Sequence, residues 1–225
     1  QCCLVGSEMC IRDRTSTATT RRTIQLPIDD GVVGLRGLSP QRHRFELEYA
    51  LERGSTANSV LFEAGDGAPA VLVHPPGVAY SEVFLPVLAE ALPSSDAPLL
   101  VVVGHVNPNR VALLRDLAEA YAGLELIISN PGAKLIEELW SQRKPAPPGE
   151  TSEQPPLPDL PPLRVIRQEQ TLPLSHQRSL MLLPAPTPRW PGGLLAFEES
   201  LGLLMSDKFF SAHLCTEDWA EANRS

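Results

Sequence analysis

The first part of the chain is a series of short apolar segments separated by turn-forming residues. Clusters such as Asp29-Asp30-Gly31 and Gly65-Asp66-Gly67 separate them, and Gly and Asp favour turns because they tolerate backbone conformations that strands exclude. This pattern predicts an antiparallel meander. The predicted strands are residues 23–28, 32–35, 45–49, 59–63 and 70–74.

The middle of the chain changes to strands that alternate with helices. Residues 81–92 and 111–122 carry apolar side chains at helical spacing, and residues 133–140 predict a further short helix. Ser81 is the expected N-cap of the first helix, and Gly123 is the expected stop of the second. The predicted strands here are residues 99–103, a continuous apolar run typical of a strand buried on both faces, and 124–128.

Residues 144–162 are dense in proline and acidic side chains, which predicts an extended surface loop because proline removes backbone donors. A proline-rich ligand for an SH3-type domain is the alternative. Strand patterns then return at residues 164–167, 179–183, 194–197 and 202–205. Strands, an α/β middle and strands again favour an α+β architecture of two sheets sandwiched between helices.

Composition narrows the class of protein further. The chain has 225 residues, 43% of them hydrophobic, which is enough for one sizeable core. A net charge of −8 without a long Lys/Arg cluster argues against nucleic acid as a partner. No apolar run approaches the roughly 20 residues that a membrane span needs. Three of the four cysteines lie in the first ten residues, which is neither a disulfide framework nor a zinc pattern.

The two ends of the chain call for separate treatment. Residues 1–14 resemble a translated sequencing adapter and lack the layout of a signal peptide. We therefore expect residues 1–22 to be a non-native or disordered leader, with a genuine but disordered terminus as the alternative. Residues 23–225 are the expected domain, incomplete at its C-terminal end.

The most informative stretch is VVVGHVNPNR, in which a buried strand ends at Gly104 and polar residues open a helix. The carboxyl ends of strands are where α/β proteins collect functional side chains. Asn107 followed by proline is also a favourable helix start, with Asn as N-cap and Pro at the first helical position. From these residues alone, a capped helix and a hydrogen-bonded structural His105 are favoured over a metal site.

This stretch resembles the H-x-E-x-D-H motif of flavodiiron proteins, read here as His105, Asn107, Asn109 and Arg110. Three other segments resemble the same family. They are ERGSTANSVL (similar to G-T-x-N-S-Y-L), PTPRWP (similar to T-P-x-x-H-W-P) and LMSDKFFSAHLC (similar to S-N-D-A-F-G-Q-H-Y-C). Because the segments occur in family order, residues 23–225 are identified as a metallo-β-lactamase-like domain of this family. The resemblance implies an αββα four-layer sandwich, truncated at the C-terminal end.

The resemblance also implies which positions correspond to the di-iron ligands. These positions are His105, Asn107, Asn109, Arg110, Arg189 and Lys208, with Asp207 one residue from the register of Lys208. Among these positions only His105 is still a residue that can bind iron, since Asn lacks a negative charge and Arg offers no lone pair. We expect no metal, no catalytic residue and no cofactor-binding residue in this chain.

With these replacements, the site carries amides and basic side chains in place of the carboxylates and histidines of the family motif. His105, Arg110, Arg189 and Lys208 are expected to surround one cavity, which would hold a small anion or recruit Asp207. The alternative is that the long basic side chains turn outward to solvent.

The closest subgroup is that of oxygenic phototrophs, in which one of two paralogous types has such replacements. The family reduces dioxygen to water with electrons from NAD(P)H through flavin. The resemblance implies flavodoxin-like and flavin reductase domains downstream, FMN in the full-length protein, and a cytoplasmic or stromal location. It also implies a homo- or hetero-oligomer with a paralogue that keeps its iron ligands, while the isolated domain is inactive. The alternatives are a scaffolding or anion-binding subunit and a metal-dependent hydrolase, whose H-x-H-x-D-H ligand set the chain lacks.

Overall fold

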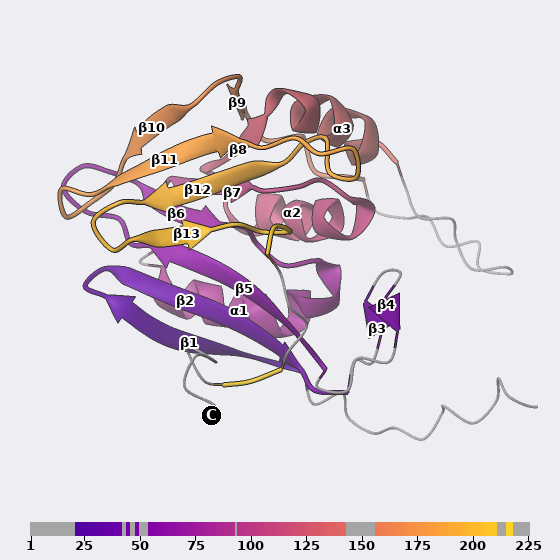
Figure 1. Cartoon of the computed structure of the whole chain (residues 1–225), viewed down its shortest axis with the longest axis horizontal. Helices are drawn as coiled ribbons and strands as arrows, with labels where there is room; N and C mark the ends of the chain where they lie inside the picture. Colours follow the sequence, from indigo (N-terminus) through magenta and orange to yellow (C-terminus); the bar gives the residue numbers. More distant parts are fainter. Residues whose placement is uncertain are drawn as a thin grey trace, which may run out of the picture.

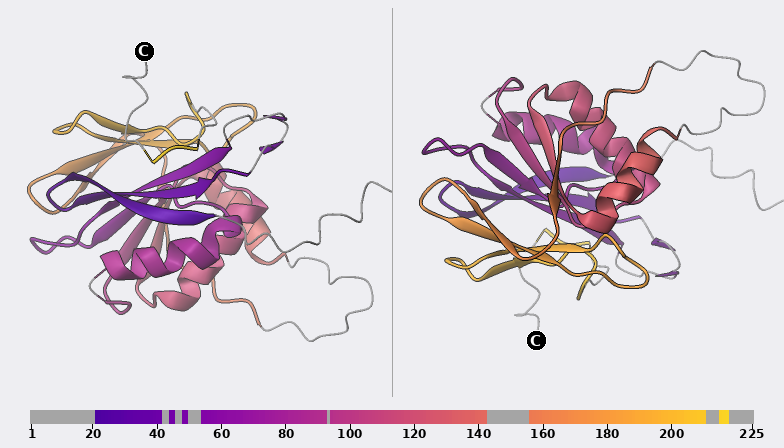
Figure 2. Two further views of the ribbon diagram at one scale, coloured as in Figure 1. Left: turned by 90° about the horizontal axis from the view of Figure 1, so that it is seen from below. Right: turned by 90° about the horizontal axis from the view of Figure 1, so that it is seen from above.

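The computed structural model describes residues 21–41, 44–45, 48–49, 54–92, 94–142, 156–210 and 215–217. A layer of helices covers one face of a seven-stranded sheet, and a four-stranded sheet packs on the other face (Figures 1 and 2). The predictions for residues 1–14 and for most of the proline-rich segment lie outside the described residues.

The large sheet combines the predicted meander with the predicted α/β region. The neighbouring strands from β1 through β6 pair antiparallel, whereas β6, β7, β8 and β9 run parallel to one another. In spatial order its strands are β1 (Arg22–Asp29), β2 (Val32–Ser39), β5 (Ser55–Phe62), β6 (Ala70–Val73), β7 (Leu99–Val103), β8 (Leu124–Ser129) and β9 (Leu163–Ile166).

The remaining elements complete the layers. The small antiparallel sheet contains β10 (Gln170–Pro173), β11 (Ser179–Pro184), β12 (Leu194–Glu198) and β13 (Leu203–Met205). The helices are α1 (Ser81–Ala91), which follows a 3-10 turn (Val78–Tyr80), α2 (Pro108–Ala120) and α3 (Asn130–Trp140). A separate hairpin pairs β3 (Arg44–Phe45) with β4 (Glu48–Tyr49).

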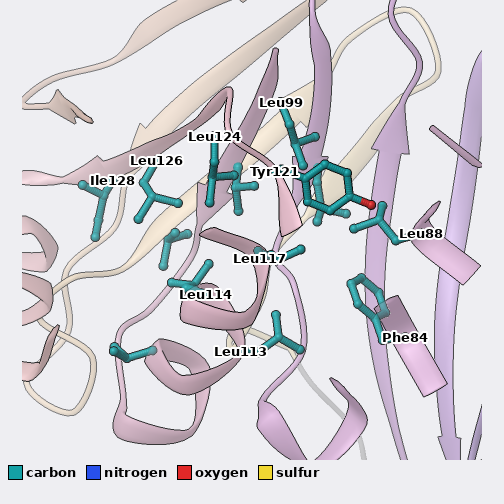
Figure 3. Packing of buried hydrophobic residues seen from close by; sticks show 14 of the residues in the cluster. Phe84, Leu88, Leu99, Leu113, Leu114, Leu117, Tyr121, Leu124, Leu126 and Ile128 are labelled. Atoms are coloured by element: carbon teal, nitrogen blue, oxygen red, sulfur yellow. The ribbon is translucent and has the colours of Figure 1, made fainter. Parts of the chain in front are cut away.

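Two apolar cores hold the layers together, one on each face of the large sheet. On β7, Val101 and Val103 belong to the core beneath the helices, whereas Leu100 and Val102 belong to the core between the sheets. Figure 3 shows the helix-side core, into which Leu114 of α2 points. The continuous apolar run of β7 therefore reflects burial on both faces, as its sequence predicts.

Most predicted strands are confirmed, with differences where the pattern is weak. The single strand predicted at residues 45–49 is wrong, because Phe45 lies in β3 whereas Glu48 and Tyr49 lie in β4, which pairs antiparallel with it. Strand β2 continues past Leu35 through Gly37, where a side chain would collide with the ring of Tyr80. Strand β10 was not predicted, since its exposed polar residues give no apolar pattern and only its pairing with β11 defines it.

The hydrogen bonds at the helix ends show which of the predicted caps form. The Asn107 cap is confirmed, because its Oδ1 accepts from the backbone N–H of Arg110 at 2.8 Å. The Ser81 cap is wrong, since its hydroxyl donates to Asp116 Oδ2 at 2.6 Å. Gly123 does not adopt the left-handed conformation expected of a glycine stop. Helix α3 begins three residues earlier than predicted, with Ser129 as its cap.

The described end of the proline-rich segment, residues 156–162, is tied to the fold. The indole N–H of Trp140 donates to the carbonyl of Pro158 at 2.8 Å, and the N–H of Leu126 donates to the carbonyl of Pro162 at 2.9 Å. Leu160 packs against the helix-side core. Residues 156–162 form neither helix nor strand, as expected for a loop, and these contacts anchor them to the domain. Among the described residues, no helix is long and apolar enough to cross a membrane.

Candidate degenerate metal centre

The candidate site lies at the edge of the sandwich where strands from both sheets end. His74 follows β6, His105 follows β7, and Asp207 follows β13. These side chains line a cavity of about 500 Å³ together with Arg110 and Lys208. The fold therefore brings to one place segments that are about 130 residues apart in the sequence.

The carboxylate of Asp207 is the centre of the site. It accepts a hydrogen bond from His105 Nδ1 at 2.5 Å. Arg110 donates to both carboxylate oxygens, at 3.0 Å to Oδ2 and 3.2 Å to Oδ1, in the bidentate arrangement that a guanidinium favours. Gly104 makes this approach possible, because a Cβ at that position would collide with the carboxylate.

Asn107 determines which ring nitrogen of His105 carries the proton. Its Oδ1 caps helix α2, so its Nδ2 is the atom that faces His105 Nε2, at 3.0 Å. An amide nitrogen only donates, so Nε2 accepts and Nδ1 holds the proton that it donates to Asp207. Arg110 Nη1, at 2.9 Å from the protonated Nδ1, is then a close contact and not a hydrogen bond. Both ring nitrogens of His105 are therefore occupied by protein partners.

The protonation states follow from the same contacts. Burial alone would raise the pKa of Asp207, but the Arg110 guanidinium and the His105 hydrogen bond hold it well below its usual value. Burial, reinforced by Arg110, lowers the pKa of His105 to about 4. At neutral pH the cluster of Asp207, Arg110 and His105 therefore contains a carboxylate, a guanidinium and a neutral imidazole, and its two opposite charges neutralise each other.

His74 is a site residue that the sequence reasoning missed. It is 4% exposed, and its Nε2–H donates to the carbonyl of Leu194 at 3.1 Å. Burial lowers its pKa to about 4, although the nearby Asp207 carboxylate opposes the shift. A histidine directly after the apolar run of residues 70–73 carries the same signal as His105, and that signal could have identified it.

The other predicted basic residues lie around Trp190. The ring of His105 meets the Trp190 ring edge-on, with centroids 4.8 Å apart. The Lys208 Nζ lies 5.0 Å, and the Arg189 Cζ 5.3 Å, from the Trp190 centroid. The structure thus brings His105, Arg110 and Lys208 to the cavity, along with Asn107 and Asn109, whereas the exposed Arg189 stacks on Trp190 outside the cavity lining of the described residues.

These residues do not fit a di-iron centre. His105 has no ring nitrogen left for a metal, and Asp207 is already bound at both oxygens by Arg110. The guanidinium is a permanent cation beside the carboxylate, so a metal ion would have to displace it. Within the described part of the chain, no three His, Cys, Asp or Glu side chains are grouped to hold a metal ion.

Comparisons with known proteins place the chain among flavoproteins. No protein-family model matches the sequence. Diflavin flavoprotein A 6 of Nostoc sp. PCC 7120 is 35% identical over 211 residues, which are 91% of this chain and 34% of that protein. A second Nostoc relative, diflavin flavoprotein A 4, is 34% identical over 213 residues. The chain thus spans about a third of the length of these curated relatives.

The solved structures that resemble this chain are also flavoproteins or flavodiiron proteins. A fragment, residues 1–254, of diflavin flavoprotein A 5 from Nostoc sp. PCC 7120 is 30% identical, with a TM-score of 0.73 over 88% of this chain and 70% of that one. A metal-soaked flavodiiron core from Synechocystis sp. PCC6803 is also 30% identical, with a TM-score of 0.70 over 88% of this chain and 44% of that one. A flavoprotein from Thermotoga maritima, at 17% identity and a TM-score of 0.72, shares the fold. These neighbours confirm the predicted α+β, metallo-β-lactamase-like fold.

Proposed function

Since the chain belongs to the flavodiiron family, in the diflavin flavoprotein A group found in cyanobacteria, we propose that it is part of an oxidoreductase subunit whose own metal site has been replaced by an internal ion pair. The single observation that carries this proposal is the contact of Asp207 with Arg110 and His105. The guanidinium supplies, within the protein, a positive charge of the kind that metal ions would otherwise bring to this carboxylate.

We assign the position of the bridging carboxylate to Asp207 and not to Lys208. The support is geometric, since Asp207 contacts His105, the one retained ligand position, whereas Lys208 lies over Trp190. This assignment makes the site self-neutralised. It removes the need for an anion beside Arg110.

In the full-length protein, the proposed role is in electron transfer. The subunit would bind FMN in a further domain and assemble with a paralogue that keeps its iron ligands. Electrons from NAD(P)H would pass through flavin to the partner's iron, where dioxygen is reduced to water. The support is family membership and the fact that this chain spans only about a third of its relatives.

A second candidate function, anion binding by a scaffolding subunit, is supported by the two cations beside Trp190. Lys208 and Arg189 both lie against the face of this ring. A small anion at this rim would raise the melting temperature with its concentration. If so, phosphate should stabilise the wild-type chain more than an equal ionic strength of a weakly binding salt, and Lys208→Gln should remove the difference.

The proposed function is tested with the full-length protein and a metal-bearing paralogue, purified separately and together. NAD(P)H-dependent oxygen uptake is expected from the mixture and not from this subunit alone. Replacing an iron ligand in the paralogue should abolish uptake, whereas Arg110→Met in this subunit should leave it intact in complexes that still assemble. Oxygen uptake by this subunit alone would refute the proposal.

A further inference from the structure

The cavity beside the Asp207 ion pair extends well beyond the degenerate ligand positions. Its volume of about 500 Å³ lies in the range of pockets that hold small organic molecules. Residues of β2 and β5 form one part of its lining, and β13 with the residues after it forms another. The ion pair takes up only one part of this lining, so room remains for a ligand.

The charged side chains of the lining already have partners within the protein. Arg110 and Asp207 share two hydrogen bonds. Arg36 donates to a side-chain amide oxygen at 2.8 Å and to a backbone carbonyl at 3.3 Å, and Lys208 lies over the ring of Trp190. An ionic ligand inside the cavity would have to displace some of these contacts, whereas a neutral ligand would leave them in place. The charges of the lining therefore favour a neutral occupant.

His74 contributes a rigidly held imidazole to the same lining. The residue is 4% exposed and has a left-handed backbone, with a φ of 55°, which few residues other than glycine adopt. Its N–H donates to the carbonyl of Val102 at 2.9 Å, its carbonyl accepts from Ser59 Oγ at 2.9 Å, and its Nε2–H donates to the carbonyl of Leu194 at 3.1 Å. Strained backbone that neighbouring groups hold in place is typical of functional positions, which makes His74 a candidate binding residue.

The second ring nitrogen of His74 is a hydrogen-bond acceptor. A carbonyl only accepts, so Nε2 carries the ring proton and Nδ1 has the lone pair. Burial lowers the pKa of His74 to about 4, so the ring is neutral at neutral pH and Nδ1 keeps that lone pair. Among the described residues, none hydrogen-bonds to Nδ1. Because buried polar atoms are normally paired, we expect this acceptor in the cavity lining to meet a donor from a bound molecule.

The exposed part of the lining is an apolar rim formed by Leu204, Met205, Phe209 and Phe210. Phe210 is 90% and Leu204 45% exposed, and they are the large exposed hydrophobic residues of the described chain. Exposed apolar side chains that gather at a cavity are typical of surface that a ligand covers. Phenylalanine rings also pack favourably against other aromatic rings. The rim therefore favours an aromatic ligand body.

We propose that this cavity binds a small neutral aromatic molecule with one hydrogen-bond donor, such as a phenol, whose donor meets His74 Nδ1 and whose ring lies against the apolar rim. The inference rests on the proposed function only in treating the site as free of metal. The ligand would lie beside the Asp207 ion pair and would leave it intact.

The test is equilibrium dialysis of the whole chain with 2-naphthol, with 2-methoxynaphthalene as the matched probe that has the same rings and no donor. We expect saturable binding of 2-naphthol to one site. The methoxy compound should bind about three- to tenfold more weakly, the size expected for one neutral hydrogen bond. Equal affinities for the two probes, or binding that does not saturate, would overturn the proposal.

Replacing the acceptor separates the hydrogen bond from the apolar contacts. His74→Phe should lower the affinity for 2-naphthol to that of 2-methoxynaphthalene, while the affinity for the methoxy compound changes little. His176→Phe removes an exposed histidine outside the cavity lining and is the matched control, which should keep the difference between the probes. A folded His74→Phe variant that still prefers 2-naphthol would contradict the role of Nδ1.

The rim variants keep the test decisive if His74→Phe does not fold. Leu204→Ser and Phe210→Ser change exposed side chains and should weaken both probes without changing the melting temperature. Affinities that stay the same in both rim variants would also overturn the proposal. Oxygen uptake and metal content test the proposed function separately, so either idea can fail alone.

Discussion

The Asp207–Arg110 ion pair provides the sharpest stability prediction. The two side chains are 10% and 9% exposed and share two hydrogen bonds, and His105 donates a third to Asp207. Removing one partner of a buried ion pair typically costs about 3–5 kcal/mol, because the other charge remains buried and unpaired. That is a large part of the roughly 5–15 kcal/mol that stabilises a domain. We therefore expect Asp207→Asn and Arg110→Met each to destabilise the fold by several kcal/mol.

The double variant separates an ion pair from two unrelated contributions. Asp207→Asn with Arg110→Met leaves no unpaired charge, so its cost should fall short of the sum of the single variants by about 2–3 kcal/mol. Urea unfolding followed by tryptophan fluorescence measures all three free energies of unfolding. Asp159→Asn, at an exposed position, is the control and should change stability by no more than about 0.5 kcal/mol. Additive costs, or a cost below about 1 kcal/mol for Asp207→Asn, would refute the reasoning.

Three other predictions concern Gly104, the two buried histidines and the proline-rich segment. Gly104→Ala should lower the free energy of unfolding by about 1–3 kcal/mol, because its methyl group collides with Asp207; an unchanged urea midpoint would contradict this. The folded state lowers the pKa of His74 and of His105 from 6.5 to about 4. Between these two pH values the unfolded state binds protons that the folded state does not, so the free energy of unfolding should fall as pH drops from about 6.5 to 4, by on the order of 3 kcal/mol for each histidine. Urea unfolding across that range should give a flatter profile for His74→Asn, and an unchanged slope would contradict the pKa shift. Deleting residues 144–155, which leaves the Pro158 contact in place, should change the melting temperature by no more than a few degrees; a larger loss would show that the segment supports the fold.

Local patterns were sufficient to predict most of the fold. The apolar run of residues 99–103 predicted a strand buried on both faces, and Asn107 with Pro108 predicted the start of α2. Both features depend on neighbours in the sequence. The Ser81 cap failed because its hydroxyl bonds instead to Asp116, which is 35 residues away. A pattern of neighbouring residues carries no information about a hydrogen-bond partner so far away in the sequence.

The site was predictable only in part, for the same reason. The sequence predicted that His105, Arg110 and Lys208 would meet, and the structure places all three on one cavity. It did not predict that Arg189 would stack on Trp190 outside it. The choice between Asp207 and Lys208 depends on side-chain direction after β13, which the contact with Arg110 determines.

The central claim is that an internal ion pair has replaced the metal centre, and metal content tests it most directly. The purified chain would be incubated anaerobically with excess ferrous iron, desalted and analysed for iron, with a metal-bearing flavodiiron protein treated in parallel. We predict iron far below one atom per chain and a melting temperature that neither iron nor a chelator changes, because Arg110 already occupies both oxygens of Asp207. Iron approaching two atoms per chain, retained after desalting and raising the melting temperature, would contradict the account.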